Sequence, residues 1–302
     1  MPLLLPLQWA GAHGRLLLVL GLVGGFLLPG VAQAMKPLLP TMVAFLVFVS
    51  ALRIGARDAL GRLHDAGNAL RSVLIMQLVL PLLVVGLLWI VGWQDSVFAI
   101  ALILAVSGSS ISGAPTFTAL MGHPPDGAMR LLIMGTLLLP LTILPVFLMM
   151  PGLGDTVTVV WAAVRLCVVL AIAITAAFTL RRIAFPNPSP NSVKALDGLA
   201  ALTLAIIVVG LMAGIGPAMR DDPVSLLPWM GLVFAVNFGQ QVIARLFGAS
   251  VSTSVVAGNR NIALFLVALP VSITDPLLLF IGCYQIPMYL TPLVMKLFYA
   301  RT

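Results

Sequence analysis

Glutamate is absent from this 302-residue chain, so all nine of its acidic residues are aspartate. Charged residues of any kind make up only 8% of the sequence, whereas 61% of the residues are hydrophobic. A soluble domain with this composition would expose a very large apolar surface, which excludes the soluble globular class. Together with a mean hydropathy of +1.15, the composition predicts an all-α polytopic membrane protein.

Cysteine is nearly absent, because only Cys167 and Cys283 occur and both lie in apolar segments. Their spacing is not that of a metal site, and we interpret them as packing residues. The chain also has no His-Glu metal motif, no paired acids within a span and no nucleophile elbow. The sequence therefore predicts neither an enzyme nor a cofactor.

A net charge of +7 can indicate a nucleic-acid-binding protein, but the basic residues of this chain fall between apolar runs instead of clustering on one polar face. That distribution is typical of loops beside a membrane. The expected surroundings are therefore membrane lipid, with no nucleic-acid partner.

Apolar runs of about 20 residues match the thickness of a bilayer core. Ten such runs predict ten transmembrane helices, near residues 15–34, 37–54, 71–93, 96–121, 129–150, 157–180, 195–219, 225–247, 251–270 and 275–299.

Basic residues orient these spans. With a cytoplasmic N-terminus, twelve of the sixteen lie at the inner face and only Lys36 and Arg220 lie outside, while Arg165 and Arg260 fall within spans. The positive-inside rule thus favours a cytoplasmic N-terminus in a bacterial-type inner membrane. The opening segment also resembles a signal peptide ending at Val31-Ala32-Gln33-Ala34. Its cleavage would leave nine spans with the same loop orientation, so the charge count does not distinguish the two alternatives.

The even number of spans permits two inverted five-helix repeats, residues 1–150 and 157–302. The predicted fourth and ninth spans hold corresponding positions, and both are interrupted by small or polar residues, at 107–115 and at Gly258-Asn259-Arg260-Asn261. Such paired interruptions are the best sequence indication of a transporter site at mid-membrane. Tight packing of a serine-rich helix is the alternative for the fourth span.

Arg260 lies where a lipid-facing helix should carry only apolar residues. A guanidinium at the bilayer centre costs about 2.5 to 3.5 kcal/mol, and its five N–H groups require acceptors. We therefore expect Arg260 to face a protein interior or a wet cavity and to bind an anion together with Asn259 and Asn261. The alternative is an arginine held by backbone carbonyls that only fixes helix packing.

Several motifs resemble the bile acid:sodium symporter family over nearly the whole chain from about residue 15. They are Gly24-Gly25 with Pro29-Gly30, Gln77-Leu78-Val79-Leu80-Pro81, the serine-rich stretch ending at Pro115, Asn237-Phe238-Gly239, and Val256 to Asn261. The resemblance implies a panel domain from about residues 15–54 and 157–219, and a core domain from about 71–150 and 225–299. It also implies that the broken fourth and ninth helices cross in the core and that an organic anion, such as a bile acid or small carboxylate, crosses the membrane by alternating access, commonly with sodium.

The chain departs from this family at the residues that would hold sodium. The family's glutamate corresponds to Val256 and its glutamine to Arg260, while Gly113 and Ala114 replace a Ser-Asn pair. The remaining ion-site-equivalent positions are Gln77, Arg130, Ala257 and Asn259. Sodium requires oxygen ligands, so we expect a degenerate sodium site in which the Arg260 guanidinium replaces the coupling ion. A cation that still binds backbone carbonyls and Gln77 is the alternative.

Four further side chains are candidates for contact with the anion: Ser112, Thr116 and Thr118, which follow the break in the fourth span, and Arg165 in the sixth. Hydroxyls in membrane helices also bond their own backbone, and a long arginine side chain can reach the interface. The function predicted is a secondary organic-anion transporter whose sodium coupling is lost or altered. A sodium-coupled carrier with a rearranged ion site and an anion channel remain open, as do a monomer and a homo-oligomer.

Overall fold

The computed structural model describes residues 4–63 and 67–300, apart from the side chains of a few residues near the gap and at Arg15. Within these ranges the chain is nearly all helical and contains no β-strand. Arg301, which is one of the twelve basic residues assigned to the inner face, lies outside the described residues.

The chain folds into two compact units, and each unit combines segments from both halves of the sequence. Unit 1 comprises Met1–Gly61 and Cys167–Leu226, and unit 2 comprises Arg62–Leu166 and Leu227–Thr302. The long helix α11 (Thr156–Ala184) contributes residues 156–166 to unit 2 and the remainder to unit 1.

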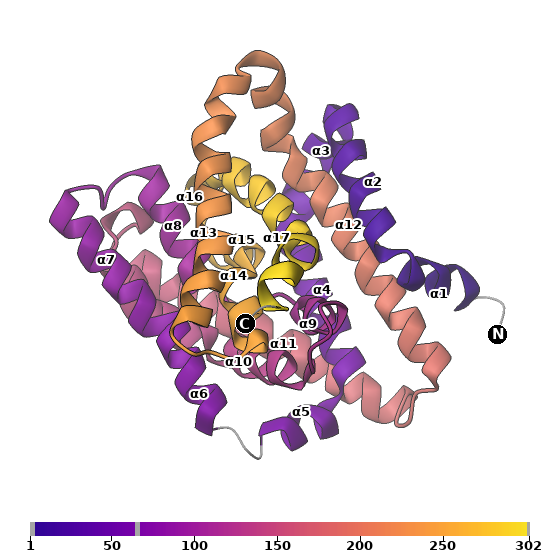
Figure 1. The fold of residues 1–302 in the computed structure, drawn as a ribbon. Helices are drawn as coiled ribbons and strands as arrows, with labels where there is room; N and C mark the ends of the chain where they lie inside the picture. The colour runs from indigo at the N-terminus through magenta and orange to yellow at the C-terminus, as the bar shows by residue number, and fades with distance from the viewer. Residues whose placement is uncertain (1–3, 64–66, 301–302) are drawn as a thin grey trace. The chain divides into compact units, whose positions relative to one another are not determined.

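Unit 1 is organised around α12 (Pro190–Asp221), along which α1, α2, α3 and α4 pack (Figure 1). Besides α12 and part of α11, its elements are α1 (Leu5–Ala12), α2 (Gly14–Leu27), α3 (Pro29–Met35), the 3-10 helix η2 (Lys36–Leu38), α4 (Leu39–Ile54), α5 (Ala56–Leu63) and the 3-10 helix η5 (Pro223–Ser225).

The first two predicted spans have different boundaries in the structure. The chain leaves helical geometry at Leu28 (φ −118°, ψ 67°), and from Pro29 it continues through η2 into α4 as one stretch, Pro29–Ile54. Proline lacks an N–H and disfavours a helical conformation in the residue before it. The break therefore falls before Pro29, not near residue 35 as the apolar runs predict.

Unit 2 contains the remaining elements. They are α6 (Gly67–Leu74), the π-helix η3 (Ile75–Val79), α7 (Leu80–Val91), α8 (Val97–Ser107), α9 (Ala114–Leu120), α10 (Asp126–Leu148), the 3-10 helix η4 (Pro151–Leu153), α13 (Leu226–Leu246), α14 (Val251–Gly258), the 3-10 helix η6 (Ile262–Leu264), α15 (Phe265–Ala268), α16 (Val271–Thr274), the 3-10 helix η7 (Asp275–Leu277) and α17 (Leu278–Tyr299).

The short helix α14 is the centre of unit 2, because α9, α10 and α17 all pack against it (Figure 1). Val255 and Val256 of α14 are buried in one apolar cluster with Ala114 of α9, Leu131 of α10 and Met295 of α17. This packing places the polar residues that follow α14 in the interior of the unit.

Among the described residues, seven helices are long and apolar enough to cross a membrane, or eight if the bent pair Leu5–Ala12 and Leu16–Leu27 counts as one span. The predicted fourth and ninth spans are not continuous helices, because each is divided into two short ones, α8 with α9 and α14 with α15. The chain is thus an all-helical, multi-pass membrane protein.

Candidate functional site

The two interruptions lie side by side in unit 2 and pair through their backbones. Ser110 and Arg260 form an isolated antiparallel β-bridge. The N–H of Asn261 donates to the carbonyl of Ser109 at 2.7 Å, and the N–H of Ile111 donates to the carbonyl of Asn259 at 3.1 Å. The two broken segments thereby satisfy backbone groups that neither helix can satisfy, as buried non-helical backbone requires.

Local sequence explains why the helices stop here. Gly108 ends α8 in an extended conformation (φ −56°, ψ 155°), and Pro115 lies in the first turn of α9, where a missing N–H costs nothing. After Gly258, Asn259 (ψ 81°) and Asn261 (ψ 73°) are both outside helical geometry. Glycine, proline and asparagine thus produce the gap that Arg260 occupies.

The guanidinium of Arg260 is buried, with 1% of the residue exposed, and its hydrogen bonds go to three backbone carbonyls. Its Nε donates to Ala257 at 2.7 Å, and its two terminal nitrogens donate to Gly108 at 3.1 Å and to Met76 at 3.4 Å. These acceptors belong to α14, to the end of α8 and to the π-helix η3. One side chain therefore ties three separate segments together.

Two of these carbonyls lie at the C-terminal ends of helices, where the helix dipole is negative and the last carbonyls have no partner within the helix. A cation at this position is stabilised by both helices. Within the part of the chain that the structure describes, no carboxylate lies within ion-pair distance of Arg260. The positive charge is therefore opposed only by dipoles.

A second polar network lies next to Arg260 and fixes the end of α14. The carbonyl of Gly258 accepts two hydrogen bonds of 2.5 Å, from Nδ2 of Asn237 on α13 and from the hydroxyl of Tyr284 on α17. The position of Gly258 admits no side chain, because a Cβ there would overlap the backbone carbonyl of Asn237. α13 and α14 thus touch backbone to backbone at the break.

The side chain of Asn259 is part of the same network. Its Nδ2 donates to the carbonyl of Val255 at 2.8 Å, and its Oδ1 accepts from the hydroxyl of Thr291 at 3.1 Å. Gln241 donates to Asn237 at 2.9 Å and to Thr291 at 3.2 Å. Asn259 is fully buried, so in this conformation its amide serves the protein interior and is not offered to a ligand.

The remaining positions that the resemblance predicts to correspond to a sodium site offer few oxygen atoms. Val256, Ala257 and Ala114 are buried apolar residues, and Gly113 has no side chain. Gln77 lies in η3, one residue after the acceptor Met76, and its Oε1 accepts a 3.3 Å hydrogen bond from Thr142. No group of three or more His, Cys, Asp or Glu residues that could hold a metal occurs in the described ranges.

The other predicted contact residues do not all gather at the break. Thr116 on α9 and Arg165 on α11 are exposed, and the Thr118 hydroxyl donates to its own helix at the carbonyl of Ala114 (2.9 Å). Arg130 is half-buried in the first two turns of α10. Ser112 and Asn261 are partly exposed; Asn261 belongs to the paired backbone, and Ser112 follows it directly. They are the predicted polar residues best placed to meet a ligand beside Arg260.

Tyr284, Thr291 and Gln241 were missed as members of the site. Their spacing indicates them, because Tyr284 and Thr291 stand seven residues apart in an apolar span and therefore share one helix face. Gln241 follows Asn237 by four residues on α13, which again places two amides on one face.

Comparison with known proteins gives this chain no family. No protein-family model matches it. A search of curated proteins likewise finds no match. The resemblance to the bile acid:sodium symporter family therefore stays a prediction from the motifs quoted above.

Proposed function

We propose that this protein is a secondary transporter of organic anions that resembles the bile acid:sodium symporters but does not use sodium. The proposal rests on the position of the Arg260 guanidinium, which is buried against the carbonyl ends of two interrupted helices. In transporters with broken helices, unwound carbonyls and helix C-terminal ends are the groups that hold a coupling cation. In this protein the Arg260 guanidinium, a covalently attached cation, binds such carbonyls.

The proposed topology has ten spans. The long and bent helices supply eight of them, and the pairs α8 with α9 and α14 with α15 supply the fourth and ninth. In the proposal, residues 1–150 and 157–302 form inverted repeats, the N-terminus is cytoplasmic and the membrane is the inner membrane. The backbone pairing of Ser110 with Arg260 supports a crossing of the two interrupted spans.

The proposed loss of sodium coupling rests on the positive charge of Arg260 and on the lack of oxygen ligands for sodium. A second cation near Arg260 would be repelled, and Val256, Ala114 and Gly113, at positions that the resemblance assigns to sodium ligands, have no side-chain oxygen. The organic anion balances the fixed positive charge. At a separation of about 6 Å and an effective dielectric constant of about 20, this attraction is about 3 kcal/mol, or about 100-fold in affinity.

Ser112 and Asn261 are the proposed selective contacts, since both are partly exposed beside the break. Three of the five N–H donors of Arg260 bond carbonyls, and only 1% of the residue is exposed, so Arg260 attracts the anion through its charge while Ser112 and Asn261 make the contacts. Asn259 is assigned a positioning role, because its amide holds Val255 and Thr291.

Counterflow tests the proposed transport. Proteoliposomes loaded with unlabelled bile acid or small carboxylate are expected to accumulate the labelled compound transiently and saturably, because a carrier exchanges its substrate. Empty liposomes are the control. Flux that neither saturates nor is stimulated by internal substrate would identify an anion channel, and no flux with any carboxylate, steroid or sulfonate would contradict the proposal.

A further inference from the structure

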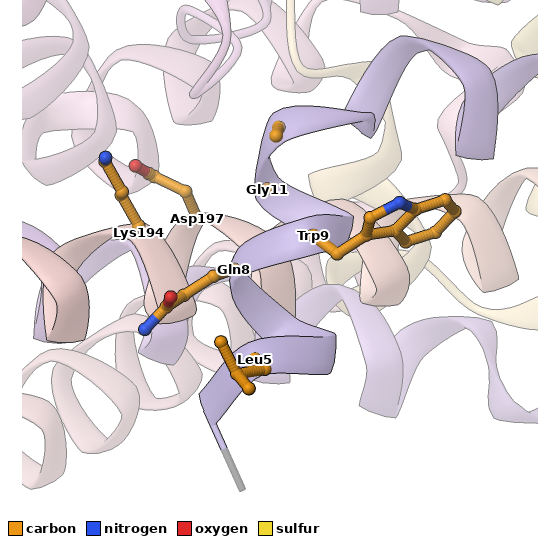
Figure 2. A pocket seen from close by; sticks show the side chains of 7 residues that line it. Leu5, Gln8, Trp9, Gly11, Lys194 and Asp197 are labelled. Atoms are coloured by element: carbon orange, nitrogen blue, oxygen red, sulfur yellow. The ribbon is translucent and has the colours of Figure 1, made fainter. Parts of the chain in front are cut away.

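A cavity of about 550 Å³ lies in unit 1, far along the chain from Arg260 (Figure 2). Helix α1 forms one wall with Leu5, Gln8, Gly11 and Ala12, and the first two turns of α12 form the other with Lys194 and Asp197. Trp9 also contributes to the wall, while its indole ring extends to the opposite side of α1 (Figure 2).

The cavity exists because α1 and α12 touch at two glycines. A Cβ on Gly11 would lie 2.7 Å from the carbonyl of Lys194, and a Cβ on Gly198 would overlap the carbonyl of Leu7. This close contact fixes α1 on α12 and leaves the polar ends of Gln8, Lys194 and Asp197 together on one side of α1 (Figure 2).

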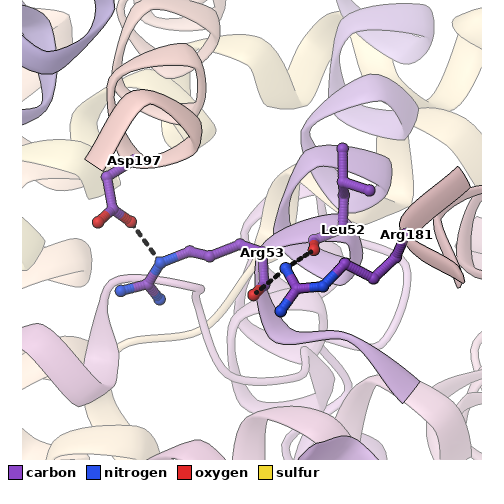
Figure 3. Close-up of polar contacts among 4 residues, drawn as sticks. All are labelled: Leu52, Arg53, Arg181 and Asp197. Atoms are coloured by element: carbon purple, nitrogen blue, oxygen red, sulfur yellow. Dashed lines mark hydrogen bonds and ion pairs between the residues drawn. The ribbon is translucent and has the colours of Figure 1, made fainter. Parts of the chain in front are cut away.

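The charge around the cavity is positive. Asp197 is paired with Arg53 of α4, while the neighbouring Arg181 donates to the carbonyls of Leu52 (2.8 Å) and Arg53 (3.3 Å) (Figure 3). The Lys194 side chain is exposed. Three cations therefore stand against one carboxylate. Asp197 balances Arg53, and of the two other cations only Lys194 lines the cavity.

The cavity lies at the depth of lipid headgroups. Helix α12 has 32 residues, so it is about 48 Å long, whereas the hydrocarbon core is about 30 Å thick. Lys194 comes within the first two turns of this helix and thus near the membrane surface. The α1 axis is turned by 86° from the following helical segment, so α1 does not continue in the direction of that segment.

The exposed residues of α1 fit such an interfacial position. Trp9 is 52% exposed and Leu5 is 62% exposed. Tryptophan is enriched at membrane interfaces, where its ring meets both headgroups and acyl chains. Helix α1 can therefore seat an acyl chain along its apolar side while the cavity receives the polar headgroup.

We infer that this cavity binds the phosphate headgroup of an anionic phospholipid. Lys194 supplies the charge, and the Gln8 amide, one N–H of which bonds the Asn191 carbonyl at 3.4 Å, donates its second N–H to the phosphate. Phosphate is a strong acceptor of charge-assisted hydrogen bonds, and basic pockets between membrane helices bind anionic headgroups. This site is separate from Arg260 and does not depend on transport.

The test measures lipid affinity in detergent by native mass spectrometry, with phosphatidylglycerol as the probe and phosphatidylcholine as the neutral comparison. Lys194→Gln is expected to weaken phosphatidylglycerol binding about fivefold, the effect of one basic residue at an anionic surface. The matched control is Arg182→Gln, which removes one exposed charge from α11 in the same unit but does not line the cavity. It is expected to change the affinity less than twofold.

Equal losses of phosphatidylglycerol affinity in Lys194→Gln and Arg182→Gln would mean that the lipid is attracted by the overall positive charge, and this result would overturn the proposed site. Equal binding of phosphatidylglycerol and phosphatidylcholine would overturn it as well. Inorganic phosphate and glycerol phosphate serve as soluble competitors, and displacement of the lipid by either at equal concentration would assign the cavity to a soluble phosphate instead. Because no transport substrate is present, these results are independent of the proposed function.

Discussion

Replacing Arg260 with glutamine is expected to weaken anion binding about 100-fold, the factor that corresponds to the loss of about 3 kcal/mol of charge attraction. Arg260 donates hydrogen bonds to three backbone carbonyls. The shorter, neutral glutamine side chain can make only one of these hydrogen bonds, so the variant also loses the other two. Hydrogen bonds from charged donors contribute about 1.5 to 3 kcal/mol each, although removal of a buried charge offsets part of this loss. A lower unfolding temperature should accompany the loss of affinity.

A purely structural Arg260 would give a different pattern, so affinity and stability must be measured on the same samples. Arg260→Lys keeps the charge but loses the planar fork that reaches three carbonyls. This variant is expected to be destabilised yet to bind the anion more tightly than Arg260→Gln. If the two variants bind the anion equally, Arg260 serves packing alone. Arg165→Gln is the control, because Arg165 is exposed on α11 and its loss should leave both readouts near the wild-type values.

Substituting Gly258 with alanine is expected to cost about 3 kcal/mol or more of folding free energy. The added Cβ would overlap the backbone carbonyl of Asn237, which cannot rotate away as a side chain can. Overpacking of this kind costs about 1 to 3 kcal/mol. Any movement of α14 also weakens the two hydrogen bonds that the Gly258 carbonyl accepts from Asn237 and Tyr284, each contributing about 1 kcal/mol.

The matched control is Gly239→Ala on α13, where an added Cβ would meet nothing within 4 Å. Alanine within a helix is favoured over glycine by about 1 kcal/mol, so this variant should unfold at or above the wild-type temperature. Thermal unfolding followed by size-exclusion chromatography compares the two. A Gly258→Ala variant as stable as Gly239→Ala would contradict the close contact of α13 with α14.

The sequence predicts those features that local chemistry determines. Both helix interruptions follow from glycine, proline and asparagine, and the long apolar runs give most of the spanning helices. The break before Pro29 was missed because hydropathy averages over the residues that a proline separates. A run of apolar residues contains no information about a single bend.

The hydrogen-bond partners of Arg260 could not be predicted from the sequence, for a different reason. Its acceptors are the carbonyls of Ala257, Gly108 and Met76, and every residue has a carbonyl, so no residue type marks them. The exposed position of Arg165 depends on the direction in which its helix face turns, which tertiary packing sets. In contrast, the shared helix face of Tyr284 and Thr291 could have been read from their spacing.

Uptake of the transported anion into proteoliposomes, with sodium on both sides replaced by choline, tests the central claim most directly. A fixed guanidinium that has replaced the coupling ion predicts the same initial rate in sodium and in choline, together with the same affinity for the anion. A strict requirement for sodium would contradict the account, because a metal ion would then be needed at a position where Arg260 already supplies the charge.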